Sequence, residues 1–297
     1  MAVIAGGIAT SYKTTKQNKN KTKHEPKAVQ IILIALALIF FALILIIPLV
    51  LVFIKAFSQG AGLYLAAITD PIALKAVKLT LIAVAVSVVI NTVFGLTVAW
   101  AVTKFKFKGK NLLTTFIDLP FSISPIVAGL IFVLLFSTTH GVLAPFLNAW
   151  GIKIIFAPPG IVLATLFVTL PFVARELIPL MDAQGTAEEE AAFTLGAGGW
   201  KTFWLITLPN IKWALLYGVM LTAARAAGEF GAVSVVSGHI RGLTNTIPLH
   251  VEILYNEYQF TAAFAVASLL TIVAVINLII KNVSDWKIKK QENAASI

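Results

Sequence analysis

Residues 188–209 read EEEAAFTLGAGGWKTFWLITLP, a polar stretch in a chain that otherwise consists of long apolar blocks. The stretch opens with three carboxylates, continues through a glycine-rich segment and closes with an aromatic run that ends in proline. This order predicts two short helices, one that ends at about Leu195 and one that begins near Trp200. The turn between them is expected in the GAGG segment, because glycine adopts backbone angles that other residues resist.

The start of the first helix carries a pattern typical of a capping box. Thr186 is followed three residues later by Glu189, so that hydroxyl and carboxylate are expected to satisfy free backbone amides. Glu188 and Glu190 fall in the same first turn, where the helix dipole favours anions. Three glutamates would be repelled by an anionic lipid surface and suit a basic protein surface better.

The second helix is predicted to place its aromatic residues on one face. Trp200, Phe203, Trp204 and Thr207 follow the spacing i, i+3, i+4, i+7. Such a face lies in the membrane interface as an amphipathic connector, or it fills a groove on a partner protein.

The composition places the chain in a membrane. Of its 297 residues 59% are hydrophobic and 12% are charged, whereas soluble domains carry about 25% charged residues. We therefore expect an all-α, polytopic membrane protein with one membrane domain over residues 29–282. Six spans are expected at about 29–55, 76–102, 115–137, 160–180, 213–236 and 259–281. Asp118, Pro120 and Pro125 interrupt the third expected span, and two further prolines interrupt the fourth.

Basic residues predict the orientation. If both termini lie inside, the inner segments hold 16 lysines and the outer loops hold three basic residues, as the positive-inside rule requires. The inner lysines are residues 13, 16, 19, 21, 23, 27, 104, 106, 108, 110, 201, 212, 281, 287, 289 and 290. The prediction is a multi-pass protein of the cell's inner (plasma) membrane with cytoplasmic tails at 1–28, which is basic and expected to be disordered, and at 283–297. The loop 183–212 is then cytoplasmic. The net charge of +10 follows this distribution and gives no sign of nucleic-acid binding.

The sequence offers no nucleotide or thiolate chemistry. The chain has no cysteine, which excludes disulfides and thiolate metal sites. The segment GAGGWKT only superficially resembles a phosphate-binding loop, because Trp200 stands where the pattern needs glycine. No catalytic residue, cofactor site or metal site is therefore expected in this chain.

The polar stretch carries a specific family signature. The membrane subunits of ABC importers share the pattern E-A-A, three residues, G, nine residues, I-x-L-P. All of its fixed positions are present here, at Glu190, Ala191, Ala192, Gly196, Ile206, Leu208 and Pro209. The chain thus resembles these type I permease subunits. The segment 224–270 resembles most closely the CysW-type permeases of sulfate/thiosulfate importers, and molybdate permeases share its core GEFGA, residues 228–232.

The resemblance implies a set of partners. The signature loop would dock into a cleft on a cytoplasmic ABC ATPase, two copies of which bind ATP and Mg. A homologous second permease subunit would complete the translocation pathway, and an extracytoplasmic binding protein would deliver the oxyanion. Sulfate is the expected solute. A molybdate or tungstate permease is the alternative within the class, and a secondary anion transporter or an embedded enzyme is the alternative outside it.

Two charges lie inside the fifth expected span. Arg225 and Glu229 are one helical turn apart, so they can pair and must face the interior of the protein. Either they form a structural ion pair, or Arg225 helps a dianion cross the membrane while Glu229 holds the guanidinium. Gly228 and Gly231 are expected to allow close helix packing.

The outer segment SGHIRGLTNTIPLHVEILYNEY, residues 237–258, is the last candidate site. It is interpreted as a solvated loop, or as a contact for the binding protein through His239 and Arg241. Its two histidines lack a third ligand at a spacing typical of metal sites. Arg175 and Glu176 are expected at the inner end of the fourth span, with no role assigned.

Overall fold

The computed structural model describes the backbone of residues 27–295 and the side chains of residues 27–282. This part of the chain is helical and contains no strand, which confirms the predicted all-α fold class. The chain divides into two units, residues 1–48 and 49–297. Apart from its last two residues, the expected basic tail at 1–28 lies outside the described residues.

The first apolar helix runs without a break from Lys27 to Ala56. It consists of α1 (Lys27–Phe41), a π-helical turn η1 (Ala42–Ile46) and α2 (Ile47–Ala56). Its 30 residues correspond to a length of about 45 Å, enough to cross a hydrocarbon core of ~30 Å.

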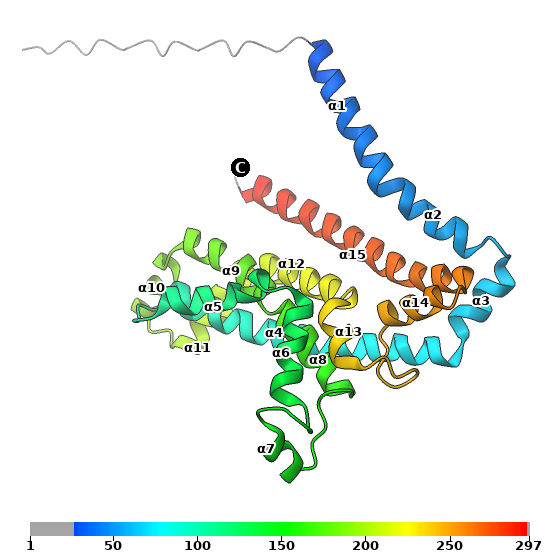
Figure 1. Ribbon diagram of the computed structural model, residues 1–297. Helices are drawn as coiled ribbons and strands as arrows, with labels where there is room; N and C mark the ends of the chain where they lie inside the picture. Colours follow the sequence, from blue (N-terminus) through cyan, green and yellow to red (C-terminus); the bar gives the residue numbers. More distant parts are fainter. Residues whose placement is uncertain (1–26, 296–297) are drawn as a thin grey trace, which may run out of the picture. The chain divides into compact units, whose positions relative to one another are not determined.

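The second unit is a bundle of helices around α4 (Figure 1). Its elements are α3 (Ala61–Thr69), α4 (Pro71–Lys104), α5 (Lys110–Ser122), α6 (Pro125–Phe136), α7 (Ala144–Ala149), α8 (Pro158–Thr169), α9 (Pro171–Gln184), α10 (Ala187–Thr194), α11 (Gly199–Thr202), the π-helical turn η2 (Phe203–Thr207), α12 (Leu208–Ala227), α13 (Gly231–Ser237), α14 (Ile247–Asn256) and α15 (Phe260–Ala295).

Helix α4 is the centre of this bundle. The carboxylate of Asp70 caps its start by accepting from the amides of Ile72 and Ala73, at 2.9 and 3.1 Å. Pro71 at the first helical position has no amide that needs a partner. The helix packs against α8, α9 and α12. A Cβ on Gly95 would stand 2.7 Å from Cβ of Val173, so glycine lets α4 and α9 approach closely.

The third expected span, 115–137, is not one straight helix. Helices α5 and α6 meet at an angle of 107° across Ile123 and Ser124. Pro125 causes this break, because a proline disfavours helical angles in the residue before it and has no amide to donate. Pro120, in contrast, lies within α5.

The fifth expected span, 213–236, is not one continuous helix to residue 236. The helical segment begins at Gly199 and ends at Ala227, and α13 is a separate helix that packs on α6 and α8. The chain leaves the helix at Gly228, and the Glu229 carboxylate accepts from the amide of Ala232 at 2.9 Å. A side chain that satisfies a free amide at a helix start favours a new helix over continuation of the old one.

Within residues 27–295, five helical segments can cross a membrane by length and hydropathy, and the bent pair α5–α6 can supply a sixth span. The five are Lys27–Ala56, Pro71–Lys104, Pro158–Gln184, Gly199–Ala227 and Phe260–Asn282. Helices α10 and α11 lie at the end of α4 that carries Lys104, and α14 lies near its other end (Figure 1). The polar stretch and the outer segment are thus at opposite ends of the bundle.

Candidate functional site

The glycine turn of the polar stretch forms as expected from the sequence. Helix α10 ends at Thr194, and Gly196 has a φ of 85°, which side chains other than glycine rarely tolerate. Gly198 has an ordinary φ of −76°, and Gly199 begins α11. Gly196 alone of these three therefore requires glycine for its backbone angle.

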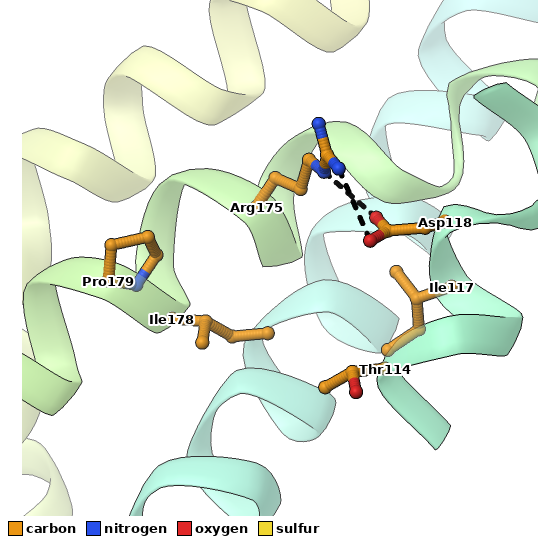
Figure 2. Close-up of a pocket in the computed structure, with 6 residues that line it drawn as sticks. All are labelled: Thr114, Ile117, Asp118, Arg175, Ile178 and Pro179. Atoms are coloured by element: carbon orange, nitrogen blue, oxygen red, sulfur yellow. Dashed lines mark hydrogen bonds and ion pairs between the residues drawn. The ribbon is translucent and has the colours of Figure 1, made fainter. Parts of the chain in front are cut away.

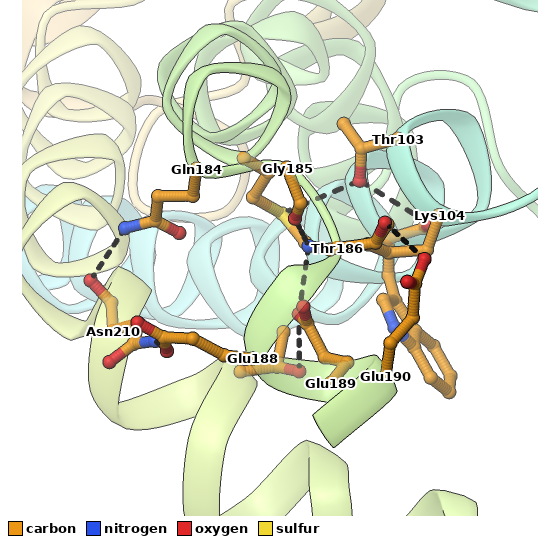
Figure 3. A network of polar contacts seen from close by, with 12 residues as sticks. Thr103, Lys104, Gln184, Gly185, Thr186, Glu188, Glu189, Glu190 and Asn210 are labelled. Carbon is orange, nitrogen blue, oxygen red and sulfur yellow. Dashed lines mark hydrogen bonds and ion pairs between the residues drawn. The ribbon is translucent and has the colours of Figure 1, made fainter. Parts of the chain in front are cut away.

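The expected capping box does not form. The hydroxyl of Thr186 donates to the Glu190 carboxylate at 2.7 Å, and no side chain caps α10. Glu189 instead pairs with Lys104 at 2.8 Å, and it accepts from the hydroxyl of Thr207 at 3.2 Å (Figure 3). A capping pattern concerns only neighbours along the chain, whereas here the last turn of α4 brings the ammonium group of Lys104 to the Glu189 carboxylate.

The Lys104–Glu189 pair joins α4 to α10. The two side chains are 8% and 14% exposed, and the Lys104 ammonium also donates to the carbonyl of Gly185. The Glu188 carboxylate accepts from the amide of Asn210, near the start of α12 (Figure 3). Polar contacts therefore tie α10 to both α4 and α12. Glu190 is exposed. Among the described residues, its carboxylate accepts one hydrogen bond, from the neutral hydroxyl of Thr186.

The aromatic residues of the predicted face lie together, with the ring centre of Phe203 6.1 Å from that of Trp200 and 5.6 Å from that of Trp204, but the bundle covers part of this face. Phe203 and Thr207 are buried, and Phe203 lies 5.1 Å from the ring of Trp100 between ring centres. Trp200 and Trp204 are exposed. The segment Phe203–Thr207 is a π-helical turn, in which i→i+5 hydrogen bonds replace the α-helical ones and shift the side-chain register.

The exposed side chains of α10, α11 and η2 form an apolar surface, which we call the loop surface. It comprises Phe193, Leu195, Trp200, Trp204 and Leu205. Leu195 is 88% exposed and Trp200 is 74% exposed. So many large apolar side chains close together on a polar loop indicate a surface that a partner covers.

The other signature residues hold the loop onto the bundle. Ala192 is buried, and Ile206 and Leu208 are partly buried. Leu208 packs against a core cluster formed by α4, α9 and α12. Pro209 lies in the first turn of α12, where a proline needs no amide partner. Ala191 is exposed beside Glu190.

The Arg225–Glu229 pair forms across the break between α12 and α13. The Glu229 side chain is 1% exposed, whereas that of Arg225 is 35% exposed. Glu229 also holds the start of α13 through Ala232, so it has a structural task. The guanidinium remains accessible from outside the chain.

Gly231 and Gly228 differ in packing. A Cβ on Gly231 would stand 2.9 Å from Cβ of Pro125, so α13 and α6 are in close contact there. A Cβ on Gly228 would meet nothing closer than the carbonyl of Ala224, at 3.9 Å. Within the described chain Gly228 therefore makes no close helix contact, and this glycine marks the end of α12.

The outer segment is folded, so the interpretation as a solvated loop is wrong. It contains α14, which packs on α15 and α4, and Leu249 is fully buried. The His239 imidazole lies 3.3 Å from the Glu252 carboxylate, and Arg241 pairs with Glu257. Among the described residues, no three His, Cys, Asp or Glu side chains come together as metal ligands would.

A buried polar group at the start of α14 had no counterpart in the sequence prediction. Asn245, Thr246 and His250 are all at least 95% buried and each has a polar atom without a hydrogen bond among the described residues. Burial lowers the pKa of His250, the Asp70 carboxylate partly counters this, and Arg241 lowers the pKa further. The imidazole is therefore held in its neutral form.

A second ion pair connects α5 and α9. Arg175 and Asp118 bind each other beside a cavity of about 340 Å³ (Figure 2). No local pattern pairs them, because 57 residues separate them. Each charge alone, in an otherwise apolar span, was the available signal.

Two comparisons by sequence bear on this arrangement. Residues 91–289 match the family of binding-protein-dependent transport system inner membrane components. The chain is 49% identical over 247 residues to the sulfate transport system permease protein CysW of Escherichia coli. This match covers 83% of the chain and 84% of the relative. This chain belongs to that transport family.

The permease also resembles a second sulfate transport permease and a solved transporter. It is 38% identical over 215 residues to the sulfate transport system permease protein CysT of Escherichia coli, with 72% and 77% of the two chains covered. A chain in the crystal structure of a bacterial alginate ABC transporter with its periplasmic protein has a TM-score of 0.74. That match covers 89% of the permease and 96% of the other chain at 18% identity, and it supports the fold.

Membership of the family explains the layout of the permease. The matched region runs from Asn91 in α4 into α15, so it includes the signature loop, the ion pairs of Arg175 and Arg225, and the outer segment. The permease is thus a transport subunit with its polar stretch at one end of the spans and a folded segment at the other.

Proposed function

We propose that the permease carries sulfate, and also thiosulfate, through the inner membrane as part of an ATP-driven importer. The observation that carries this proposal is 49% identity to a sulfate permease over 83% of the chain. The second permease subunit is a homologue of the CysT type, because this chain is also 38% identical to such a protein. The two subunits enclose the pathway between them.

The loop surface is proposed to dock on a cytoplasmic ABC ATPase, two copies of which serve the pair of permease subunits and bind ATP and Mg. Two features support this docking. The five apolar side chains lack cover within the described chain, and the Glu190 carboxylate beside them is free to meet a cation of the ATPase. Apolar burial supplies affinity, and the charge supplies orientation.

Movement of the ATPase must reach the spans, and the Lys104–Glu189 pair offers a path for it. Glu189 stands on the docked helix α10, and Lys104 is the last residue of the central helix α4. The contact of Glu188 with Asn210 adds a connection to α12. We therefore expect α10, α4 and α12 to move together when the ATPase closes.

At the outer end, His239 and Arg241 are proposed to contact the solute-binding protein. Both side chains are exposed, and each is held in place by a carboxylate of α14 or the residue that follows it. Between the two ends, Arg225 is proposed to line the pathway, because its guanidinium is accessible while Glu229 fixes it. A guanidinium binds oxyanions through parallel hydrogen bonds.

Uptake measurements test the proposed substrate. Cells that lack this chain should take up labelled sulfate only when the chain is restored, and unlabelled sulfate and thiosulfate should compete. Competition by molybdate with no uptake of sulfate would contradict the proposal and indicate a molybdate permease.

Purification tests the proposed docking. The tagged chain should retain an ABC ATPase, and Glu190→Lys should weaken that retention by about tenfold, since it replaces attraction by repulsion. Glu188→Lys is the matched control, because Glu188 faces Asn210 of the same chain. Equal retention by both variants and the wild-type chain would rule out the role of Glu190.

A further inference from the structure

We propose that the cavity between α5 and α9 is a transient binding site for a tetrahedral oxyanion on the translocation pathway, which we call the station. Arg175 binds the oxyanion there, and Asp118 is a positioning residue. We call this cavity the Arg175 pocket. Its lining residues are Thr114, Ile117, Asp118, Arg175, Ile178 and Pro179 (Figure 2). The proposal rests on the proposed function, in that it assumes an oxyanion as the solute.

The guanidinium of Arg175 is held in place by Asp118 and keeps hydrogen-bond donors for a further acceptor. Its Nε donates to one Asp118 oxygen at 2.8 Å, and Nη2 donates to the other at 3.2 Å. The group also lies over the ring of Phe121, 4.8 Å from the ring centre. A guanidinium carries five N–H donors, so two bonds to Asp118 leave about three donors for a further acceptor.

The Arg175–Asp118 pair is exposed in the isolated chain, at a position where contact with lipid would be unfavourable. The Arg175 and Asp118 side chains are 58% and 42% exposed in the isolated chain. Arg175 lies five residues, about 8 Å, from the inner end of the fourth expected span at residue 180. The pair is therefore expected just inside the cytoplasmic edge of the hydrocarbon core. Charged side chains in a span face other protein or water rather than lipid.

The chemistry of the pocket suits a small oxyanion better than an organic solute. Its volume of about 340 Å³ is at the lower end of the range for ligand sites. Ile117, Ile178 and Pro179 supply apolar walls, which strengthen the attraction between an anion and the guanidinium. The Thr114 hydroxyl donates to the carbonyl of Asn111 at 2.9 Å, so Arg175 is the principal donor.

Neutralisation by Asp118 makes the station a weak one. The ion pair has no net charge, so a dianion gains hydrogen bonds from Arg175 while the Asp118 carboxylate opposes it. Weak binding is what a pathway requires, because a solute must leave each site as readily as it enters. Glu176, the next residue on α9, packs against Gly218 of α12 on another face of the helix, so it does not add a second carboxylate to the pocket.

The test uses the whole importer reconstituted in proteoliposomes. Arg175→Ala should lower oxyanion uptake about 10- to 100-fold, as expected for lost hydrogen bonds to a charged group. Arg175→Lys keeps the charge but loses the planar fork, so it should raise the KM for uptake by about tenfold. Asp182→Asn is the control, because Asp182 is an exposed carboxylate on α9 outside the pocket. Its uptake should equal that of the wild-type importer.

A double variant separates a station from a purely structural ion pair. Arg175→Met with Asp118→Leu leaves no unpaired charge, so the importer should assemble and its ATPase should still respond to the binding protein. The proposal expects such an importer to take up oxyanion at least about tenfold more slowly than wild type. Wild-type uptake by the double variant, or an unchanged KM in Arg175→Lys, would overturn the proposal.

Wild-type uptake of sulfate, thiosulfate and molybdate is measured first. If the importer carries molybdate and not sulfate, the proposed function fails, and the variants then test the station with molybdate. If sulfate is carried and the variants behave like wild type, only the station fails. Uptake of none of the three oxyanions would overturn both.

Discussion

At the scale of residues, the ion pair of Lys104 and Glu189 combines burial with a link between two helices. Glu189→Gln leaves the Lys104 ammonium mostly buried and without its counter-ion. Removal of one partner from a buried pair costs about 3 kcal/mol, so the variant should lower the melting temperature of the purified importer. We also expect the ATPase to stay bound while its activity no longer drives uptake.

Two variants serve as controls for this prediction. Glu188→Gln changes an exposed carboxylate that faces an amide, and it should leave the melting temperature unchanged. Lys104→Met with Glu189→Met removes both charges and should recover most of the lost stability. If Glu189→Gln and Glu188→Gln melt at the same temperature, the ion pair contributes no stability.

His250 is expected to make the stability of the outer segment depend on pH. Burial holds the pKa of the folded His250 below the usual value near 6.5. As the pH falls below about 6.5, the unfolded chain therefore binds more protons than the folded chain. Stability is therefore fully present above about pH 6.5 and is lost as the pH falls towards the folded pKa. The melting temperature of the importer should fall between about pH 7 and about pH 5.5, and His250→Gln should flatten this fall.

The exposed residue His140 offers the matched control for this titration. His140→Gln should retain the full pH dependence. A wild-type importer that melts at the same temperature across this range would show that His250 titrates without a change in stability.

At the scale of elements, the turn between α10 and α11 depends on one glycine. Gly196→Ala meets no neighbouring atom within 4 Å but must keep a φ of 85°, which costs a residue with a side chain roughly 1–2 kcal/mol. The altered turn should reorient α11 relative to α10 and reduce ATPase retention. Retention by the tagged chain measures this effect.

Gly198→Ala is the matched substitution in the same turn. Gly198 has a φ of −76° and open space around its Cβ position, so alanine should be tolerated with normal retention of the ATPase. Loss of retention in both variants would show that the turn needs small residues rather than a special backbone angle.

The helices were predictable from apolar runs, but only some of their interruptions were. A proline in an apolar run indicates a break, and Pro125 indeed starts a new helix at 107° to the previous one. The break at Gly228 depends on the buried Glu229 carboxylate, which satisfies the amide of Ala232. Phe203–Thr207 is a π-helical turn, and Phe203 is buried while the neighbouring Trp200 is exposed; spacing alone gives no sign of either.

At the scale of the whole molecule, the predicted orientation can be tested directly because the chain has no cysteine. Single cysteines at Lys108, between α4 and α5, and at Tyr258, after α14, should react differently with a membrane-impermeant maleimide. In intact cells Tyr258→Cys should be labelled and Lys108→Cys should not. In inside-out vesicles the result should be reversed, and labelling of Lys108→Cys in intact cells would contradict cytoplasmic termini.

The sequence by itself determined the membrane class, the helical fold and the signature loop with its glycine turn. These features depend on local properties: the length of apolar runs, the distribution of lysines and the backbone freedom of glycine. Only the tertiary structure decided which charges meet, as Lys104 meets Glu189 and Arg175 meets Asp118. Such pairs join residues 57 or more positions apart, and their partners are selected by helix packing, which no local pattern specifies.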